Sequence, residues 1–265
     1  MKRVVNIVVW LILMLTFGCE EEIDKDIDLQ VLNRYIVEAN ITNENKAHEV
    51  LIHHGTHDLN ETSQPVTGAK VFIYNELDTF VCTEDTIPGH YITEPFITAA
   101  GITYTLKFTH NGFTDSATAT AIGVSKLGDI SIAKTDSLYR YYFTGSEKPC
   151  KMEIQYSWQN DAAFTGYYGA PQAKEYFYKL NNIDVPAIFD PDKQIIKFPA
   201  GTTIIRRKYS LSPKHQEYLR HLLLETEWRG GIFDVEPGNI PSYFANGSLG
   251  FFGACMVLGD TTVVE

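Results

Sequence analysis

Residues 35–41 read Tyr-Ile-Val-Glu-Ala-Asn-Ile, and apolar and polar side chains alternate along this run from Val37. Alternation with a period of two is typical of a β-strand that buries one of its faces. Comparable β-patterned runs follow at residues 49–53, 69–74 and 104–108, separated by proline, glycine and polar turn residues. The first half of the chain is therefore predicted to be all β.

Several short strands in succession favour a sandwich, and we expect an immunoglobulin-like domain over residues 31–122. The cysteine and tryptophan pattern of antibody domains is absent, since this stretch contains Cys82 alone. Residues 123–128 are interpreted as a short linker. A second β-rich domain is expected over residues 129–265, with strands at 130–132, 139–143, 152–158, 175–180, 195–198, 202–209 and a final apolar strand at 248–258.

One α-helix is predicted within this second domain, at about 212–228. Ser212 is suited to the N-cap and Pro213 to the first helical position. Apolar residues then fall on one face, and two glycines follow the end of the pattern. The fold class is thus mainly β, with an N-terminal sandwich and a second β-rich, sandwich-like domain that carries this helix.

The charge and composition of the chain make a nucleic-acid partner unexpected and exclude full disorder. The chain has 33 acidic residues against 22 Lys and Arg, for a formal net charge of -11. Because such a surface repels phosphate backbones, nucleic acid is not expected as a partner. Hydrophobic residues make up 44% of the sequence, which excludes a chain that is disordered throughout.

The N-terminus has the features of a signal peptide over residues 1–18, since Lys2 and Arg3 precede an almost wholly apolar run. About 14 apolar residues are too few for a transmembrane helix, which needs about 20. Residues 15–19, Leu-Thr-Phe-Gly-Cys, resemble the bacterial lipobox and predict a lipid anchor on Cys19. The alternative is ordinary cleavage, which leaves Cys19 buried or disulfide-bonded.

Residues 19–30 are predicted to be a solvated acidic tether. The acidic run begins with Glu20, Glu21, Glu22 and Asp24. It resembles the surface-export signal of Bacteroidota lipoproteins, which implies an outer-membrane protein that faces the exterior and contacts membrane lipid through acylated Cys19. The alternative is a generic charged spacer in the periplasm, so the leaflet stays open.

The sequence contains no GxSxG, HExxH or P-loop pattern, so we expect neither an enzyme nor a cofactor. Histidines crowd residues 48–57, where His53 and His57 are candidate metal ligands. The alternative for these two is a solvated loop and strand edge. Three cysteines remain if Cys19 is acylated, and they are either small buried residues or include one disulfide. These three are Cys82, Cys150 and Cys255.

Two further sets of residues are candidates for exposed functions. The segment 160–171 is interpreted as an aromatic loop in which Phe164, Tyr167 and Tyr168 stack on a ligand, with core packing as the alternative. Four short motifs resemble the O-glycosylation motif of Bacteroidota. Their hydroxyl residues are Thr86, Ser116, Ser137 and Thr261.

The order of several motifs along the chain is more specific than any one of them. These motifs are the lipobox, residues 35–39, PVTGAKV at 65–71, PGHY at 88–91, GITYTL at 101–106, the helix at 212–224, GNI at 238–240 and GSLGFFGA at 247–254. Together they resemble a Bacteroidota lipoprotein family known as domain of unknown function 4249 (DUF4249). The resemblance implies a TonB-dependent receptor as a partner, and it brings no catalytic residues.

From the anchor, the tether and this resemblance we expect a surface-exposed outer-membrane lipoprotein that is a non-catalytic accessory or binding component of a TonB-dependent transport system. One alternative is a structural or adhesive cell-envelope protein. The other is hydrolysis at a cleft between the two domains, which requires acidic residues to converge there.

Overall fold

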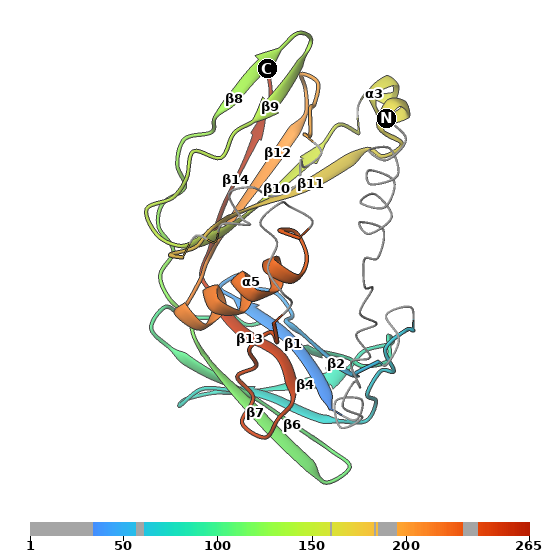
Figure 1. Cartoon of the computed structure of the whole chain (residues 1–265), viewed down its shortest axis with the longest axis vertical. Coiled ribbons are helices and arrows are strands. Elements are labelled where there is room, and N and C mark those ends of the chain that lie inside the picture. The colour runs from blue at the N-terminus through green and yellow to red at the C-terminus, as the bar shows by residue number, and fades with distance from the viewer. Residues whose placement is uncertain (1–33, 57–60, 160, 183, 185–194, 230–237) are drawn as a thin grey trace, which may run out of the picture.

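A computed structural model of the chain describes residues 34–56, 61–159, 161–182, 184, 195–229 and 238–265. The predicted mainly β fold is confirmed, because the described residues form fourteen strands and two α-helices (Figure 1). The predicted signal peptide, Cys19 and the acidic tether lie outside the described residues. None of the described helices is long and apolar enough to span a membrane.

Eight strands form the first sheet, in the spatial order β13-β1-β2-β5-β4-β3-β6-β7. Alternate residues of β1, Val37, Ala39 and Ile41, are buried in its core, as the alternating pattern predicts. The strands are β1 Tyr35–Thr42, β2 Glu49–His54, β3 Lys70–Tyr74, β4 Thr79–Glu84, β5 His90–Thr93, β6 Thr103–His110, β7 Phe113–Thr120 and β13 Leu249–Cys255.

The first sheet curls until its two edge strands, β13 and β7, lie beside each other. Asp115 of β7 is fully buried, and its carboxylate accepts hydrogen bonds from the backbone N–H groups of Asn246 and Ser248, at 2.7 and 2.9 Å. A parallel bridge also joins Ile122 to Cys255. The N-terminal unit is therefore a barrel-like sandwich that a C-terminal strand closes.

Four strands form the second sheet, in the order β11-β10-β12-β14. A hairpin of two further strands covers one of its faces, where Tyr141 and Phe198 pack with Met152 and Ile154. The strand expected at 195–198 is not formed, because Phe198 makes only an isolated bridge to Tyr139. The elements are β8 Ile132–Thr135, β9 Leu138–Tyr141, β10 Cys150–Ser157, α3 Ala162–Tyr168, β11 Gln172–Lys179, β12 Thr203–Ser210 and β14 Val257–Val263.

The segment expected to be a linker, residues 123–128, is bound to the second sheet. The ammonium group of Lys208 donates to the carbonyl of Lys126 at 2.8 Å, and the guanidinium of Arg206 donates to the carbonyl of Gly128 at 3.0 Å. Both cationic side chains come from β12 and are buried. The connection between the two sheets is therefore held in place by buried charged groups rather than left solvated.

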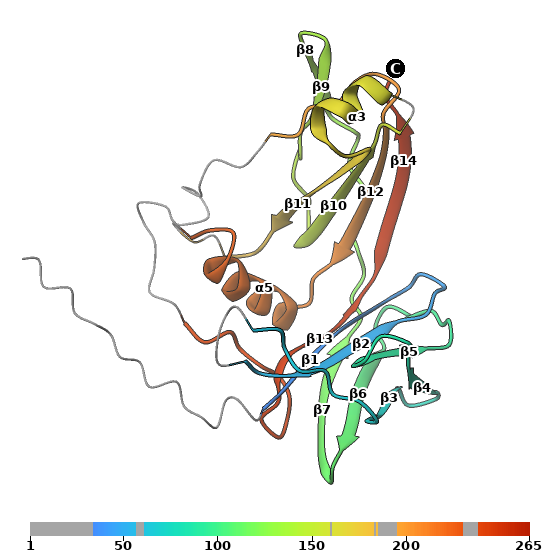
Figure 2. The same ribbon diagram turned by 90° about the vertical axis from the view of Figure 1, so that its right-hand side faces the viewer.

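The final apolar strand expected at 248–258 is in fact two strands that meet at Met256. β13 runs parallel to β1, with Leu249 opposite Ile36, while β14 pairs with β12 of the second sheet. Figure 2 shows this continuous path from one sheet into the other. Residues 129–265 are thus not one structural unit, since the apolar pattern marks burial but does not identify the partner strand.

The predicted helix is α5, Pro213–Glu225, and Ser212 is its N-cap. The Ser212 hydroxyl accepts a hydrogen bond from the backbone N–H of His215 at 3.3 Å. Figure 2 shows α5 between the two sheets. Its buried residues contact β13 on one side and a cluster that includes Leu180 and Leu211 on the other. The helix therefore packs inside the molecule, at the junction of the sheets.

Gly250 is expected to be required for the pairing of β13 with β1. Its φ is +98°, and a Cβ there would overlap the carbonyl oxygen of Val37. Gly250→Ala is therefore expected to lower the free energy of unfolding by roughly 3 kcal/mol or more. Gly247→Ala is the matched control, since its φ is +93° but its Cβ would meet open space. Urea unfolding measures both, and equal losses would contradict the close-approach argument.

Candidate functional site

A groove of about 600 Å³ lies where the two sheets and α5 meet. It is called the junction groove here, and it runs between the outer face of β1 and β2 and one side of α5. The strand pattern explains its floor, because Glu38 and Asn40 alternate with the core residues of β1 and so point outward. Lys151 of β10 reaches it from the second sheet.

One wall of the junction groove is aromatic. Phe251 of β13 stacks on Tyr218 of α5, with ring centroids 4.5 Å apart and an interplanar angle of 17°. The ring of His215 lies 4.6 Å from the same phenylalanine. Tyr218 and His215 are three residues apart on the helix, so they share a face. The wall is consequently made of three rings in contact.

A thiol and an imidazole lie behind this wall. The Sγ of Cys255 is 3.5 Å from Nδ1 of His215, and it donates to Oδ1 of Asn40 at 3.2 Å. Burial raises the pKa of Cys255 to about 12 and lowers the pKa of His215 to about 3. Both groups are therefore neutral near pH 7, which is opposite to the thiolate and imidazolium of a reactive pair.

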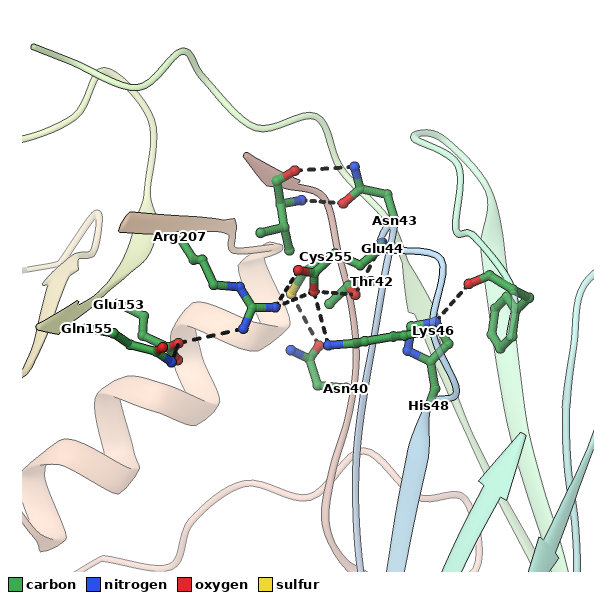
Figure 3. A network of polar contacts seen from close by, with 12 residues as sticks. Asn40, Thr42, Asn43, Glu44, Lys46, His48, Glu153, Gln155, Arg207 and Cys255 are labelled. Atoms are coloured by element: carbon green, nitrogen blue, oxygen red, sulfur yellow. Dashed lines mark hydrogen bonds and ion pairs between the residues drawn. The ribbon is translucent and has the colours of Figure 1, made fainter. Parts of the chain in front are cut away.

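An ion-pair network joins the two sheets beside the groove (Figure 3). Arg207 of β12 binds Glu44, which follows β1, and lies 3.6 Å from Glu153 of β10. Burial alone would raise the pKa of Glu44, but hydrogen bonds from Lys46 and Arg207 outweigh burial and lower it. Asn43 adds side-chain hydrogen bonds to both backbone groups of Val257, at 2.6 and 3.2 Å.

Several polar groups of the groove, the Glu38 carboxylate and the Tyr218 hydroxyl among them, make no hydrogen bond or ion pair in the part of the chain that the structure describes. Two others are nitrogen groups. One is the ammonium group of Lys151, and burial lowers the pKa of this lysine. The other is Nδ1 of His48, whose Nε2 faces the Phe96 carbonyl at 3.1 Å. Burial also lowers the pKa of His48, so this ring is neutral.

A family model described as domain of unknown function (DUF4249) matches residues 20–259, which contain the groove, the first sheet and the second sheet as far as Gly259 in β14. The chain belongs to the DUF4249 family. The resemblance inferred from the order of the motifs is thus confirmed. No curated protein matches the sequence.

This DUF4249 chain has a second hollow at one end of the first sheet, about 640 Å³ in volume. It is called the tip pocket here. Tyr74, Phe80 and Tyr104 form its aromatic lining. Leu77 and Ile97 also line the pocket and are 89% and 58% exposed. The tip pocket therefore exposes large apolar side chains next to the acidic residues Glu76 and Asp78.

The predicted metal and cysteine residues of this DUF4249 chain form no site within the part of the chain that the structure describes. Among the described residues, no three metal-binding side chains gather. His53 lies on β2, and His57 lies outside the described residues. Cys82, Cys150 and Cys255 are all buried and free, so the disulfide alternative among these three is not realised.

The segment interpreted as an aromatic loop is helix α3. Phe164 packs edge-on against Trp158, with centroids 5.1 Å apart, and so adds to the core of the second sheet. The structure does not describe the side chains of Tyr167 and Tyr168. A polar N-cap, Asp161, whose side chain accepts from the N–H of Phe164, is the sequence signal for this helix.

The four candidate glycosylation residues differ in exposure. Thr86, Ser137 and Thr261 are exposed, on two turns and on β14, whereas Ser116 is half-buried within β7. Asp115, which completes the motif of Ser116, is a buried acceptor for backbone N–H groups. That motif has a structural role in closing the sheet, and three motifs remain accessible.

Acid is expected to destabilise the fold through His215. Its pKa is about 3 in the folded chain against an ordinary value of 6.5, so between these values only the unfolded chain binds the proton. The free energy of unfolding therefore falls as pH drops below about 6.5. Between pH 7 and pH 4.5, the free energy of unfolding measured in urea is expected to fall less for His215→Phe than for the parent protein. Leu219→Ala is the control and should keep the parental loss.

The ion pair between Glu44 and Arg207 is expected to stabilise the junction of the sheets. A double-mutant cycle with Glu44→Gln and Arg207→Met should give a coupling energy of about 1 kcal/mol, because both side chains are partly exposed. Salt at about 1 M should reduce it. A cycle of Glu44→Gln with Lys107→Met, an exposed residue of β6, should give no coupling. Equal coupling in both cycles would contradict a direct ion pair.

Proposed function

We propose that this DUF4249 protein is a surface-exposed outer-membrane lipoprotein, anchored through acylated Cys19, that is a non-catalytic accessory or binding component of a TonB-dependent transport system. The observation that carries the binding role is the junction groove. Lys151 lines the groove from β10, and its ammonium group makes no hydrogen bond or ion pair with another described residue. A half-buried polar group normally has a polar partner, so a ligand in the groove is a natural one.

The protonation states beside the groove support binding rather than catalysis. Cys255 and His215 lie at the distance of a nucleophile and its base. Burial nevertheless holds both in their neutral forms, and the thiol itself has no exposed surface. A substrate therefore has neither a thiolate to react with nor access to the sulfur.

The tip pocket supports the presence of a protein partner. Large exposed apolar side chains that lie together commonly mark contact surfaces. Leu77 and Ile97 have this character, and Glu76 and Asp78 place negative charge beside them. We assign this surface to the receptor, whose complementary face would present an apolar side chain next to Lys or Arg.

A structural or adhesive role is the second candidate, and the exposed hydroxyls of Thr86, Ser137 and Thr261 favour it. Glycans on these residues would cover the surface that faces outward. Deletion of the gene separates the two roles. Loss of nutrient uptake supports the transport role, and loss of adhesion with unchanged uptake supports the structural one.

The full-length lipidated protein, purified from detergent-solubilised outer membranes, is expected to bring a TonB-dependent barrel with it. Leu77→Glu combined with Ile97→Glu should reduce the recovered barrel about tenfold or more, because the contact would then bury charge. Val263→Glu on β14 is the matched control, since Val263 is 57% exposed, and it should leave recovery unchanged. Recovery of the parent protein without any barrel would refute the proposal.

A further inference from the structure

β14 is an edge strand of the second sheet, and alternate residues along it direct their backbone groups toward β12 or away from it. Just beyond its C-terminal end, the N–H and C=O of Val264 bond to Thr202 and Gly201, at 2.9 and 2.7 Å. At its other end, both backbone groups of Val257 bond instead to the side chain of Asn43. Because these directions alternate in antiparallel strands, the odd-numbered residues of β14 point their N–H and C=O groups outward.

The outward groups of Gly259, Thr261 and Val263 make no hydrogen bond with any described residue. β14 pairs with β12 alone, and all three residues are exposed. In Figure 2, β14 is the outermost strand on its side of the second sheet. Each of the three residues therefore offers an N–H donor and a C=O acceptor to a further strand.

This edge lacks the charges that usually discourage strand pairing between chains. The opposite edge of the same sheet, β11, exposes Lys174 and Lys179, and lysine on an edge strand is a common protection. The edge strands of the first sheet protect each other, because β13 and β7 lie side by side. β14 has a single charged residue, Asp260, and Arg206 binds its carboxylate. β14 is therefore suited to pair with another strand.

A second copy of β14 matches this edge in one register. Antiparallel pairing about a two-fold axis at Thr261 places Thr261 opposite itself and Gly259 opposite Val263. All the outward groups then form hydrogen-bonded pairs, with about six backbone hydrogen bonds between the copies. An axis at Gly259 would need Val257, whose backbone groups Asn43 already binds. An axis at Val263 would leave Gly259 without a partner.

The side chains also fit this register. The two Thr261 side chains meet at the axis, and threonine pairs across strands are favourable. Val263, which is 57% exposed, would lie opposite Gly259, where no side chain competes for the space. On the other face of the strand, Asp260 would lie opposite Thr262, so no like charges directly oppose each other. The edge is therefore complementary to itself.

We propose that this DUF4249 protein forms a two-fold symmetric dimer through β14, in which the second sheets of two copies join into one continuous sheet. The tip pocket and the junction groove contain no residue of β14, so both stay accessible in the dimer. The contact with a receptor therefore does not depend on the dimer. A glycan on Thr261 and this dimer exclude each other, because the side chain lies on the axis.

Disulfide trapping of the full-length protein in detergent tests the register. The Cα atoms of a hydrogen-bonded antiparallel pair are about 5.5 Å apart, which suits a disulfide. Thr261→Cys is therefore expected to form a covalent dimer under mild oxidation. Val263→Cys is the matched control on the same edge, since its two copies would be offset by roughly 13 Å along the strands, and it should stay largely monomeric.

The parent protein gives the background from the native cysteines, of which the three described ones are buried. Trapping of Thr261→Cys well above Val263→Cys and the parent supports the dimer. Equal trapping of the two variants, or none of Thr261→Cys, would overturn the proposal.

Opposite charges at the axis test the same contact without a covalent bond. Sedimentation equilibrium of the parent protein in detergent should show a dimer. Thr261→Lys alone and Thr261→Glu alone should each weaken it about fivefold or more, because like charges then oppose each other. An equimolar mixture of the two variants should associate again, which also shows that both fold.

A parent protein that stays monomeric, or a mixture that associates no better than either variant alone, would refute the dimer. Thr261→Lys should recover the barrel as the parent does. Loss of the dimer with unchanged barrel recovery would therefore leave the proposed transport role standing.

Discussion

The pairing of β13 with β1 is the contact on which both halves of the molecule depend. Seven residue pairs run in parallel from Ile36 and Leu249 to Thr42 and Cys255. The same chain then continues through Met256 into β14, so the two sheets share one extended segment. The shared segment therefore fixes the register of β13 on β1 and of β14 on β12, the two ladders that meet beside the junction groove.

Polar contacts also join the two sheets beside this shared segment. Asn43 binds both backbone groups of Val257 at the point where the chain leaves the first sheet. Arg207 binds Glu44 across the same gap, and buried Lys208 holds the connecting residue Lys126. Each of these groups would be costly to bury alone. Because these groups satisfy one another, they hold the two sheets in one relative arrangement.

The sequence predicts where strands and helices lie better than it predicts which strands pair with each other. Alternation in residues 35–41 reflects one buried face and correctly indicates a strand, and Ser212 followed by Pro213 correctly marks the start of α5. The division at Met256 is not visible, because β13 and β14 form one continuous β-patterned run. Parallel pairing across some 200 residues has no local signature.

For a similar reason, the sequence does not predict which residues come together at the candidate site. His48 belongs to a histidine-rich stretch that the sequence does single out, but its buried neighbour Phe96 comes from a distant segment. Lys151 is an ordinary polar residue of an alternating strand until β11, β12 and α5 surround it. Sites assembled from five separate elements depend on topology, which sequence periodicity does not encode.

The position of β13 also sets the order in which the molecule can fold. A nascent chain that has emerged only as far as residue 248 contains seven of the eight strands of the first sheet but leaves the edge of β1 unpaired. Unpaired edges of this kind invite association with other chains. The N-terminal sandwich is therefore completed only once residues 249–255 have been synthesised, and until then the edge of β1 is open to association with other chains.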